Sequence, residues 1–424
     1  MRKSIIRVNY FKLVSTSIVV SLIVCLLADS LKKLTEFFEE HVFHFSSEHR
    51  WLFIVLPSVG ITIIYFLRKY VFKGRSNKGI KEVYQTIDNR RDELPLFKIP
   101  SHFFNGFLTV ISGGSTGIEV STVVASAAVG ASAYKKDAVA NVFKTELICA
   151  GVTAGVAILF GNPIAGILFS LEVISGKANK TLLLSNLCAA LVASIYIFFA
   201  HSHPLFSYTV SEWHTSALPY FILLSLVAAV AAVYFTRSVL FIKKRFFAIK
   251  SNFWRVNIGA LLVGTAIYFF PQLFGDSYHA IPELMASIGS GHYSSGLILL
   301  LIALVILKPL VASLTLGAGG DGGVFAPSIV LGAVLGMLVA VLGNHIFDAH
   351  LIVFNFALVG AAAALSAAIH APLTALVLVC GLVPGGYILF LPVMIGSFLA
   401  KYSAKYLFKY TVYSYKENTV AKPQ

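Results

Sequence analysis

The chain has 424 residues, of which 57% are apolar and only 12% are charged, and its mean hydropathy is +0.82. Soluble domains carry charges on about a quarter of their residues, so this composition excludes a soluble globular protein and predicts an integral membrane protein. The formal net charge is +14, but its basic residues cluster at the chain ends and in a few loops, so we expect no nucleic-acid partner.

A series of apolar runs is spread along the chain, and each is long enough, or nearly so, to cross a ~30 Å hydrocarbon core as a helix. They are Leu13–Leu27, Leu52–Leu67, Leu147–Leu171, Leu182–Ala200, Leu218–Tyr234, Val256–Phe270, Gly296–Leu314, Ser328–Leu342, Phe354–Ile369 and Leu373–Ala400. Glycine or proline interrupts several of them. We therefore expect an all-α integral membrane protein of tilted, broken and re-entrant helices, folded as a single transmembrane domain over residues 1–424.

Basic clusters set the expected orientation in the lipid bilayer. Under the positive-inside rule they all belong to the cytoplasm; they are Arg2–Lys12, Arg68–Lys81, Arg237–Arg255 and Lys401–Lys416. Both termini are then cytoplasmic, and the expected location is the plasma (cell inner) membrane. Between the first two apolar runs, Asp29–Glu48 is rich in Glu, Phe and His. We predict that this stretch is an amphipathic elbow at the membrane interface.

The next segment, Lys73–Val83, is a Gly/Ser/Asn turn that leads into a short helix and includes Lys78. Its composition is that of a turn on the surface of a protein. From these residues alone it is predicted to be a solvated cytoplasmic loop.

The stretch Gly113–Val120 places glycines and then a lone carboxylate, Glu119, at the start of a small-residue helix with no other charge until Lys135. A carboxylate at bilayer depth is costly unless it meets a partner or a water-filled cavity. Glycines let a ligand approach the free N–H groups of a helix N-terminus, where the macrodipole favours an anion. Glu119 is therefore a candidate functional residue at a place where an anion would bind.

Two motifs of the first half recur in the same order in the second half. The first motif, Gly113–Val120, has its counterpart in Gly319–Pro327 at an offset of 206 (319 − 113). The second, Asn162–Phe169, has its counterpart in Ala371–Leu378 at an offset of 209 (371 − 162). The first offset sets Glu119 on Phe325. Repeats that are broken by Gly/Pro-rich stretches indicate two inverted-topology halves, with helix ends that meet at a binding site within the membrane.

The expected halves cover about 50–200 and 218–413, with a linker over 201–217 and a cytoplasmic tail over 414–424. The four cysteines lie inside apolar runs without paired spacing, and we expect free thiols; they are Cys25, Cys149, Cys188 and Cys380. No metal-ligand motif occurs, so we expect no metal and no other cofactor. Glu172 lies near a helix end, where an acid is more often paired or capping than functional.

Several motifs resemble those of the chloride channel and chloride/proton exchanger family, and the resemblance covers nearly the whole chain. Gly323–Pro327 matches the family's Gly-x-Phe-x-Pro motif, and Pro163–Glu172 matches its Pro-Leu-Ala-Gly-x-x-Phe-x-x-Glu helix. Gly117-Ile118-Glu119 looks like the start of the Gly-x-Glu-Gly-Pro motif, which puts Glu119 on the gating glutamate, with Val-Ser in place of Gly-Pro.

Two further positions follow from the same resemblance. Asn77–Glu82 stands where the family has Gly-Ser-Gly-Ile-Pro-Glu, so Lys78 replaces the serine that coordinates the anion. Tyr413 looks like the tyrosine whose hydroxyl faces the central anion, and Tyr410 is a second candidate. A lysine that faces the path would either bind anions strongly or lose its proton.

The resemblance implies a homodimer in which each subunit holds its own path for chloride or a similar anion. Helix N-termini would bind the anion, and Glu119 would compete for an anion site. The implied anion-binding residues are Gly117, Ile118, Val324, Phe325, Tyr413 and Lys78. Amide donors suit a weakly hydrated monovalent anion that must also leave the site.

Coupling to protons depends on the residue that follows Glu172. Exchangers of the family carry a second glutamate there, and this chain has Val173, which cannot accept a proton. The sequence therefore favours passive, channel-like anion conduction or weakly proton-coupled exchange. Tightly coupled chloride/proton antiport is the alternative, because some exchangers manage with water in place of this glutamate.

Parts of the sequence also fit two other classes of protein, an enzyme and a carrier for another solute. Gly113–Gly117 fits Gly-x-Ser-x-Gly, and with His370 it would suit an intramembrane serine hydrolase. That nucleophile elbow needs a strand before the serine, and none is expected. A sodium-coupled carrier of a bulky organic solute would need a polar cavity, and the small-residue helices offer few side chains for one. We therefore do not expect an enzyme.

Overall fold

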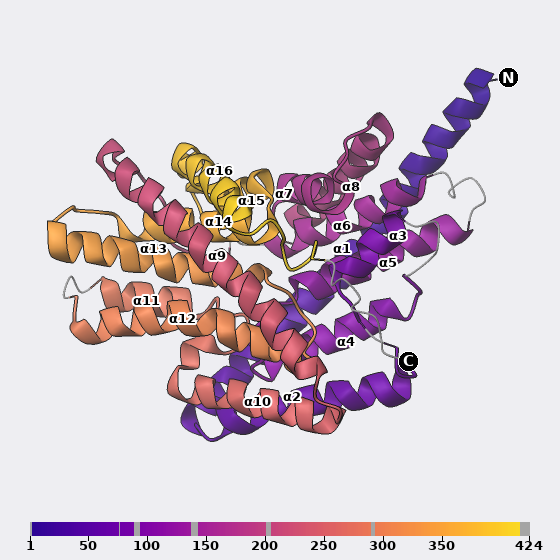
Figure 1. The fold of residues 1–424 in the computed structure, drawn as a ribbon. Helices are drawn as coiled ribbons and strands as arrows, with labels where there is room; N and C mark the ends of the chain where they lie inside the picture. The colour runs from indigo at the N-terminus through magenta and orange to yellow at the C-terminus, as the bar shows by residue number, and fades with distance from the viewer. Residues whose placement is uncertain are drawn as a thin grey trace.

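The computed structural model describes residues 2–75, 77–88, 94–136, 143–200, 205–289 and 293–415. Within these ranges the fold is all-helical, without a β-strand, as predicted. Figure 1 shows long helices that cross one another at varied tilts, with several short helices between them. Parts of the predicted linker (201–204) and tail (416–424) lie outside the described residues.

The helices of the first half begin with one that is much longer than the others (Figure 1). They are α1 (Arg2–Glu48), α2 (Leu52–Phe66), α3 (Ile80–Asp88), α4 (Lys98–Ile111), α5 (Glu119–Lys136), α6 (Lys144–Phe160), α7 (Pro163–Phe169) and α8 (Lys180–Phe199). Short π-helical turns extend α2 to Val71 and α7 to Ser175.

The second half has the same number of α-helices within the described residues. They are α9 (Leu218–Phe247), α10 (Asn252–Phe269), α11 (Ala280–Ile288), α12 (Ser295–Ala318), α13 (Phe325–Phe347), α14 (Val353–Ile369), α15 (Pro372–Cys380) and α16 (Phe390–Leu407). Seven helices of the described chain are long and apolar enough to cross a membrane. Among the shorter ones, α14 is buried on all sides and packs against α13, α9 and α16.

The predicted interfacial elbow over Asp29–Glu48 is wrong. This stretch continues α1 without a break, because residues 2–48 contain neither glycine nor proline. Its polar residues Thr35, Glu39 and Ser46 are buried against the rest of the protein. The amphipathic pattern therefore marks a helix face that packs on the protein, and this face brings Glu39 into the interior.

The second repeated motif gives two matching helix starts. Helices α7 and α15 both begin at a proline, Pro163 and Pro372, and they pack together. The Asn162 side chain caps α7 by accepting from the backbone N–H of Ile164 (3.1 Å). It also donates to the carbonyl of Val377 in α15 (2.9 Å), so one side chain ties the two halves together.

Candidate functional site

The two glycine-rich segments meet in the interior of the protein. Gly117 and Gly323 form an isolated antiparallel bridge. The Thr116 hydroxyl strengthens it by donating to the carbonyl of Gly323 (2.8 Å) and accepting from its N–H (3.0 Å). Helices α5 and α13 start two residues after these glycines, at Glu119 and Phe325. Two helix N-termini, with their free N–H groups, therefore lie at one place, which suits an anion.

Both bridging residues have to be glycine because of close contacts. A Cβ at Gly117 would collide with both carboxylate oxygens of Glu119, and a Cβ at Gly323 would collide with Val120. The same Cβ at Gly323 would lie 3.1 Å from the hydroxyl of Tyr413. The missing side chains make the space that the Glu119 carboxylate and the tyrosine occupy.

Glu119 is only 4% exposed, and its carboxylate folds back over the start of its own helix. Oε1 accepts a hydrogen bond from the hydroxyl of Tyr278 (3.0 Å). Oε2 is buried without a well-aligned hydrogen bond within the described chain, and the backbone N–H groups of Glu119 and Ala326 lie near the carboxylate. A buried carboxylate with one open oxygen is costly to keep charged, so this side chain is suited to take up a proton or to leave its place.

The other predicted anion-binding positions lie around this point. Val324 and Phe325 are each 1% exposed, and Ile118 is half-buried. The N–H of Val324 lies 3.4 Å from the hydroxyl of Tyr413, which is 8% exposed, whereas Tyr410 is 44% exposed. The structure brings Gly117, Ile118, Val324, Phe325 and Tyr413 together, and their binding of an anion stays a prediction.

Lys78 has an exposed side chain, and its backbone N–H donates to Glu82 Oε1 (2.7 Å). Glu82 in turn is buried and forms an ion pair with the equally buried Lys98 (2.8 Å). The pair therefore fixes the turn that carries Lys78. Its place agrees with a solvated turn, and its role in anion binding stays a prediction.

Sequence reasoning gave no role to a buried charged group at the second glycine segment. Asp321 Oδ2 lies 3.0 Å from His102 Nδ1 and 4.0 Å from Arg68 Nη2, and it accepts from Asn77 Nδ2 (3.0 Å). Arg68 also donates to the carbonyl of Gly319 (2.8 Å). The sequence signal that could have predicted this cluster was the charge of Asp321 inside a glycine run between two apolar helices, because an acid in such a place needs partners.

Glu172 has the structural role that was expected of it. Its carboxylate accepts from the backbone N–H and the hydroxyl of Thr374, both at 2.8 Å, and so caps the N-terminus of α15. Val173 beside it is 8% exposed. No proton acceptor therefore stands at residue 173.

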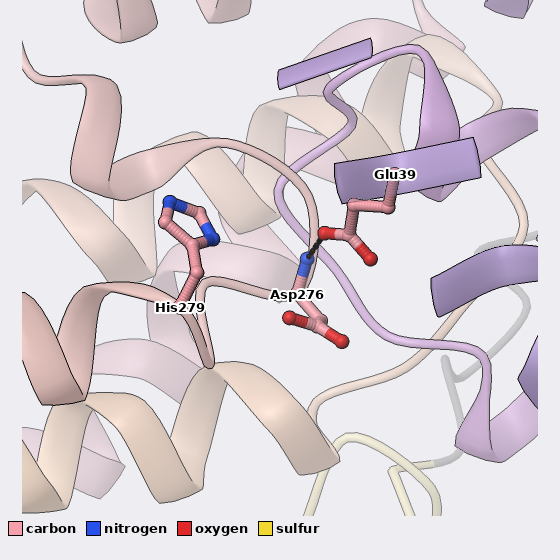
Figure 2. Close-up of side chains that lie close together, drawn as sticks. All are labelled: Glu39, Asp276 and His279. Atoms are coloured by element: carbon pink, nitrogen blue, oxygen red, sulfur yellow. Dashed lines mark hydrogen bonds between the residues drawn. The ribbon is translucent and has the colours of Figure 1, made fainter. Parts of the chain in front are cut away.

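The turn that carries Tyr278 also holds a group that could be mistaken for a metal site. One ligand atom from each of Glu39, Asp276 and His279 lies within 4.8 Å of the others, and Figure 2 shows the three side chains around the turn. The Glu39 carboxylate already accepts from the backbone N–H of Asp276 (3.0 Å), and the Lys308 ammonium lies 3.4 Å from the carbonyl of Asp276. A buried ammonium disfavours a metal cation beside it.

The arrangement around Ser115 does not match a hydrolase elbow. The segment before it is α4, a helix and not a strand. The Ser115 hydroxyl accepts from the buried ammonium of Lys308 (2.9 Å). Lys308 is the single charge in the apolar run Gly296–Leu314, and this was a signal that sequence reasoning did not use.

Comparison with known proteins agrees with this architecture. The sequence model of the voltage gated chloride channel family matches residues 59–405. An H(+)/Cl(-) exchange transporter, ClcA, of Vibrio vulnificus (strain YJ016) is 28% identical over 367 residues, which cover 82% of this chain and 75% of the relative. The ClcA of Vibrio campbellii (strain ATCC BAA-1116) is 27% identical over 383 residues, or 86% of this chain and 79% of the relative.

Solved structures share the fold at lower sequence identity. A slow cyanobacterial Cl−/H+ antiporter superposes with a TM-score of 0.80 at 20% identity, over 95% of this chain and 96% of the other. A CLC-type fluoride/proton antiporter superposes with a TM-score of 0.77 at 22% identity, over 95% and 97%. These likenesses extend over nearly all of both chains.

Proposed function

Because the chain belongs to the voltage gated chloride channel family, we propose that it carries chloride, or a similar small monovalent anion, across the membrane in exchange for protons. The observation that carries this proposal is the position of Glu119. Its buried carboxylate occupies the point where the N-termini of α5 and α13 meet. The Glu119 carboxylate and an anion cannot both fill this place. The anion therefore binds only when the side chain leaves, and protonation of the carboxylate favours that departure.

The surroundings of Glu119 support reversible binding of an anion. Backbone groups and mostly apolar side chains line the meeting point, and the buried charges Asp321 and Lys308 already have partners in His102 and Ser115. Backbone N–H dipoles attract an anion without holding it as tightly as a full opposite charge would. Protonation of Glu119 removes its negative charge and opens its place to the anion.

The proposed proton-coupled exchange differs from the passive conduction or weakly coupled exchange that the sequence favoured. The curated relatives in the comparison are named exchange transporters, and two solved structures with this fold are described as antiporters. These names support the coupled alternative. Since Val173 cannot take a proton, we infer that water carries protons between Glu119 and the cytoplasmic side.

The apolar surface supports an assembly in a cell membrane. Exposed apolar side chains recur every four residues along α8, at Leu183, Leu187, Leu191, Ile195 and Phe199. Such a ridge must be covered by lipid or by a second copy of the chain. We infer a homodimer in the plasma (cell inner) membrane with both termini in the cytoplasm, and cross-linking in membranes tests the dimer.

Chloride efflux from liposomes tests the proposed function. Purified protein is reconstituted into chloride-loaded vesicles, and efflux is started with a potassium ionophore. We expect fast efflux that depends on pH, and a changed rate with little pH dependence for Glu119→Gln, which mimics the protonated side chain. Efflux equal to that of protein-free vesicles would contradict anion transport, and a variant identical to the wild type would remove Glu119 from the mechanism.

A further inference from the structure

The hydroxyl that holds Glu119 comes from a turn between α10 and α11, and this turn is fixed from the side of α12. Lys308 in α12 is 1% exposed. Its ammonium donates to the Ser277 hydroxyl (2.6 Å), the Ser115 hydroxyl (2.9 Å) and the Asp276 carbonyl (3.4 Å). All three protons of the ammonium have acceptors. One buried side chain therefore joins the Tyr278 turn to the glycine segment before Glu119.

The same turn is fixed from the side of α1. Figure 2 shows the backbone N–H of Asp276 directed at the Glu39 carboxylate, at 3.0 Å. The Asp276 carboxylate then accepts from the N–H of Tyr278 (2.8 Å). Ser277 between them has a φ of +68°, a left-handed conformation that a serine adopts only when its surroundings hold it there. Contacts from two helices, α1 and α12, thus hold the turn in one shape.

We propose that Tyr278 is a latch that holds Glu119 in the anion path, and that Lys308 is the positioning residue that keeps this latch in reach. The proposal rests on the proposed function, because it describes how the same gate is kept closed. A hydrogen bond to a charged acceptor is stronger than one to a neutral acceptor, so the latch acts on the ionised, inserted carboxylate. When Glu119 takes a proton, the latch weakens and the side chain leaves.

The charged and titratable groups around this latch come from three places. Lys308 belongs to α12, Glu39 to α1, and Asp276 and His279 to the turn that carries Tyr278. The carboxylates of Glu39 and Asp276 disfavour a negative charge on Glu119, and the ammonium of Lys308 offsets this repulsion. The Tyr278 hydroxyl donates directly to the Glu119 carboxylate.

A double-mutant cycle between Tyr278 and Glu119 tests the latch by chloride efflux across a range of pH. Tyr278→Phe removes the hydroxyl and keeps the ring. Loss of a hydrogen bond to a charged group shifts the closed-to-open ratio by roughly tenfold or more. We expect faster efflux at high pH, a flatter pH profile, and no further change when the substitution is added to Glu119→Gln. Tyr208→Phe, which removes a hydroxyl bonded to the Pro282 carbonyl (3.4 Å), is the matched control and should behave as wild type.

A second variant, Ser277→Ala, keeps the proposal testable if Tyr278→Phe folds poorly. Ser277→Ala leaves the tyrosine in place but removes one acceptor of Lys308, so it should give a smaller change in the same direction, and none in the Tyr278→Phe background. Equal effects of Tyr278→Phe with Glu and with Gln at residue 119 would overturn the latch. A wild-type pH profile for Tyr278→Phe would do the same. If Glu119→Gln still alters efflux in that case, the latch alone fails and the proposed function stands.

Discussion

Gly117 and Gly323 lie 206 positions apart in the chain (323 − 117) and form a backbone bridge two residues before the helices that start at Glu119 and Phe325. The bridge fixes the distance between two helix N-termini, so the free N–H groups of both can act on one anion. It also leaves room for the carboxylate only while residue 117 has no side chain. The position of the Glu119 carboxylate therefore depends on a backbone contact as well as on the acid itself.

Gly117→Ala is predicted to displace the Glu119 carboxylate. The new Cβ would collide with both of its oxygens and would lie 2.7 Å from the Cβ of Ala326. We expect the side chain to leave its place, so that chloride efflux loses most of its pH dependence while the protein still folds. Gly289→Ala is the control, because its Cβ meets nothing closer than 3.5 Å. An unchanged pH profile in Gly117→Ala would show that the carboxylate does not close the path from this position.

Lys78→Ser tests the proposed role of the lysine in anion binding. Because the side chain is exposed, its charge should act mainly at long range, by raising the local anion concentration. We expect slower chloride efflux at low ionic strength, and an effect that shrinks when an impermeant salt is added. Chloride affinity measured by calorimetry should change by less than about twofold, as for other exposed charges. A large loss of affinity at every ionic strength would mean that the lysine contacts the bound anion.

Glu172→Ala is predicted to affect stability and to leave coupling unchanged. The carboxylate caps α15 through Thr374, and loss of such a cap costs about 1 kcal/mol. We expect a lower unfolding temperature in detergent and an unchanged chloride-to-proton ratio. Glu172→Gln keeps one acceptor oxygen and should lie between the wild type and the alanine variant. A changed ratio in either variant would give this acid a part in proton transfer.

Much of the fold could be predicted from local sequence signals. The 206-residue offset placed Glu119 on Phe325, and both residues begin their helices in the structure. The prolines Pro163 and Pro372 also begin matching helices, because a helix accepts proline in its first turn. Glycine and proline act on the backbone directly, so their effects can be expected without knowledge of the tertiary contacts.

The tertiary contacts around the Glu119 carboxylate could not be predicted in this way. Tyr278 and Lys308 lie 159 and 189 positions from Glu119 (278 − 119; 308 − 119), in segments without a repeated motif. Composition could suggest that a lysine in an apolar run has partners, but it could not name Ser115 and Ser277. The elbow expected after Asp29 was wrong for a related reason, since an amphipathic face looks the same whether water or protein covers it.

The central claim is that anion and proton movements are coupled through Glu119. Its most direct test imposes a chloride gradient, without a proton gradient, across proteoliposomes and records the internal pH. The account predicts net proton movement that builds up a pH difference and reverses sign when the chloride gradient is reversed, and none for Glu119→Gln. Chloride flux without any proton movement in the wild-type protein would contradict exchange and would favour passive conduction.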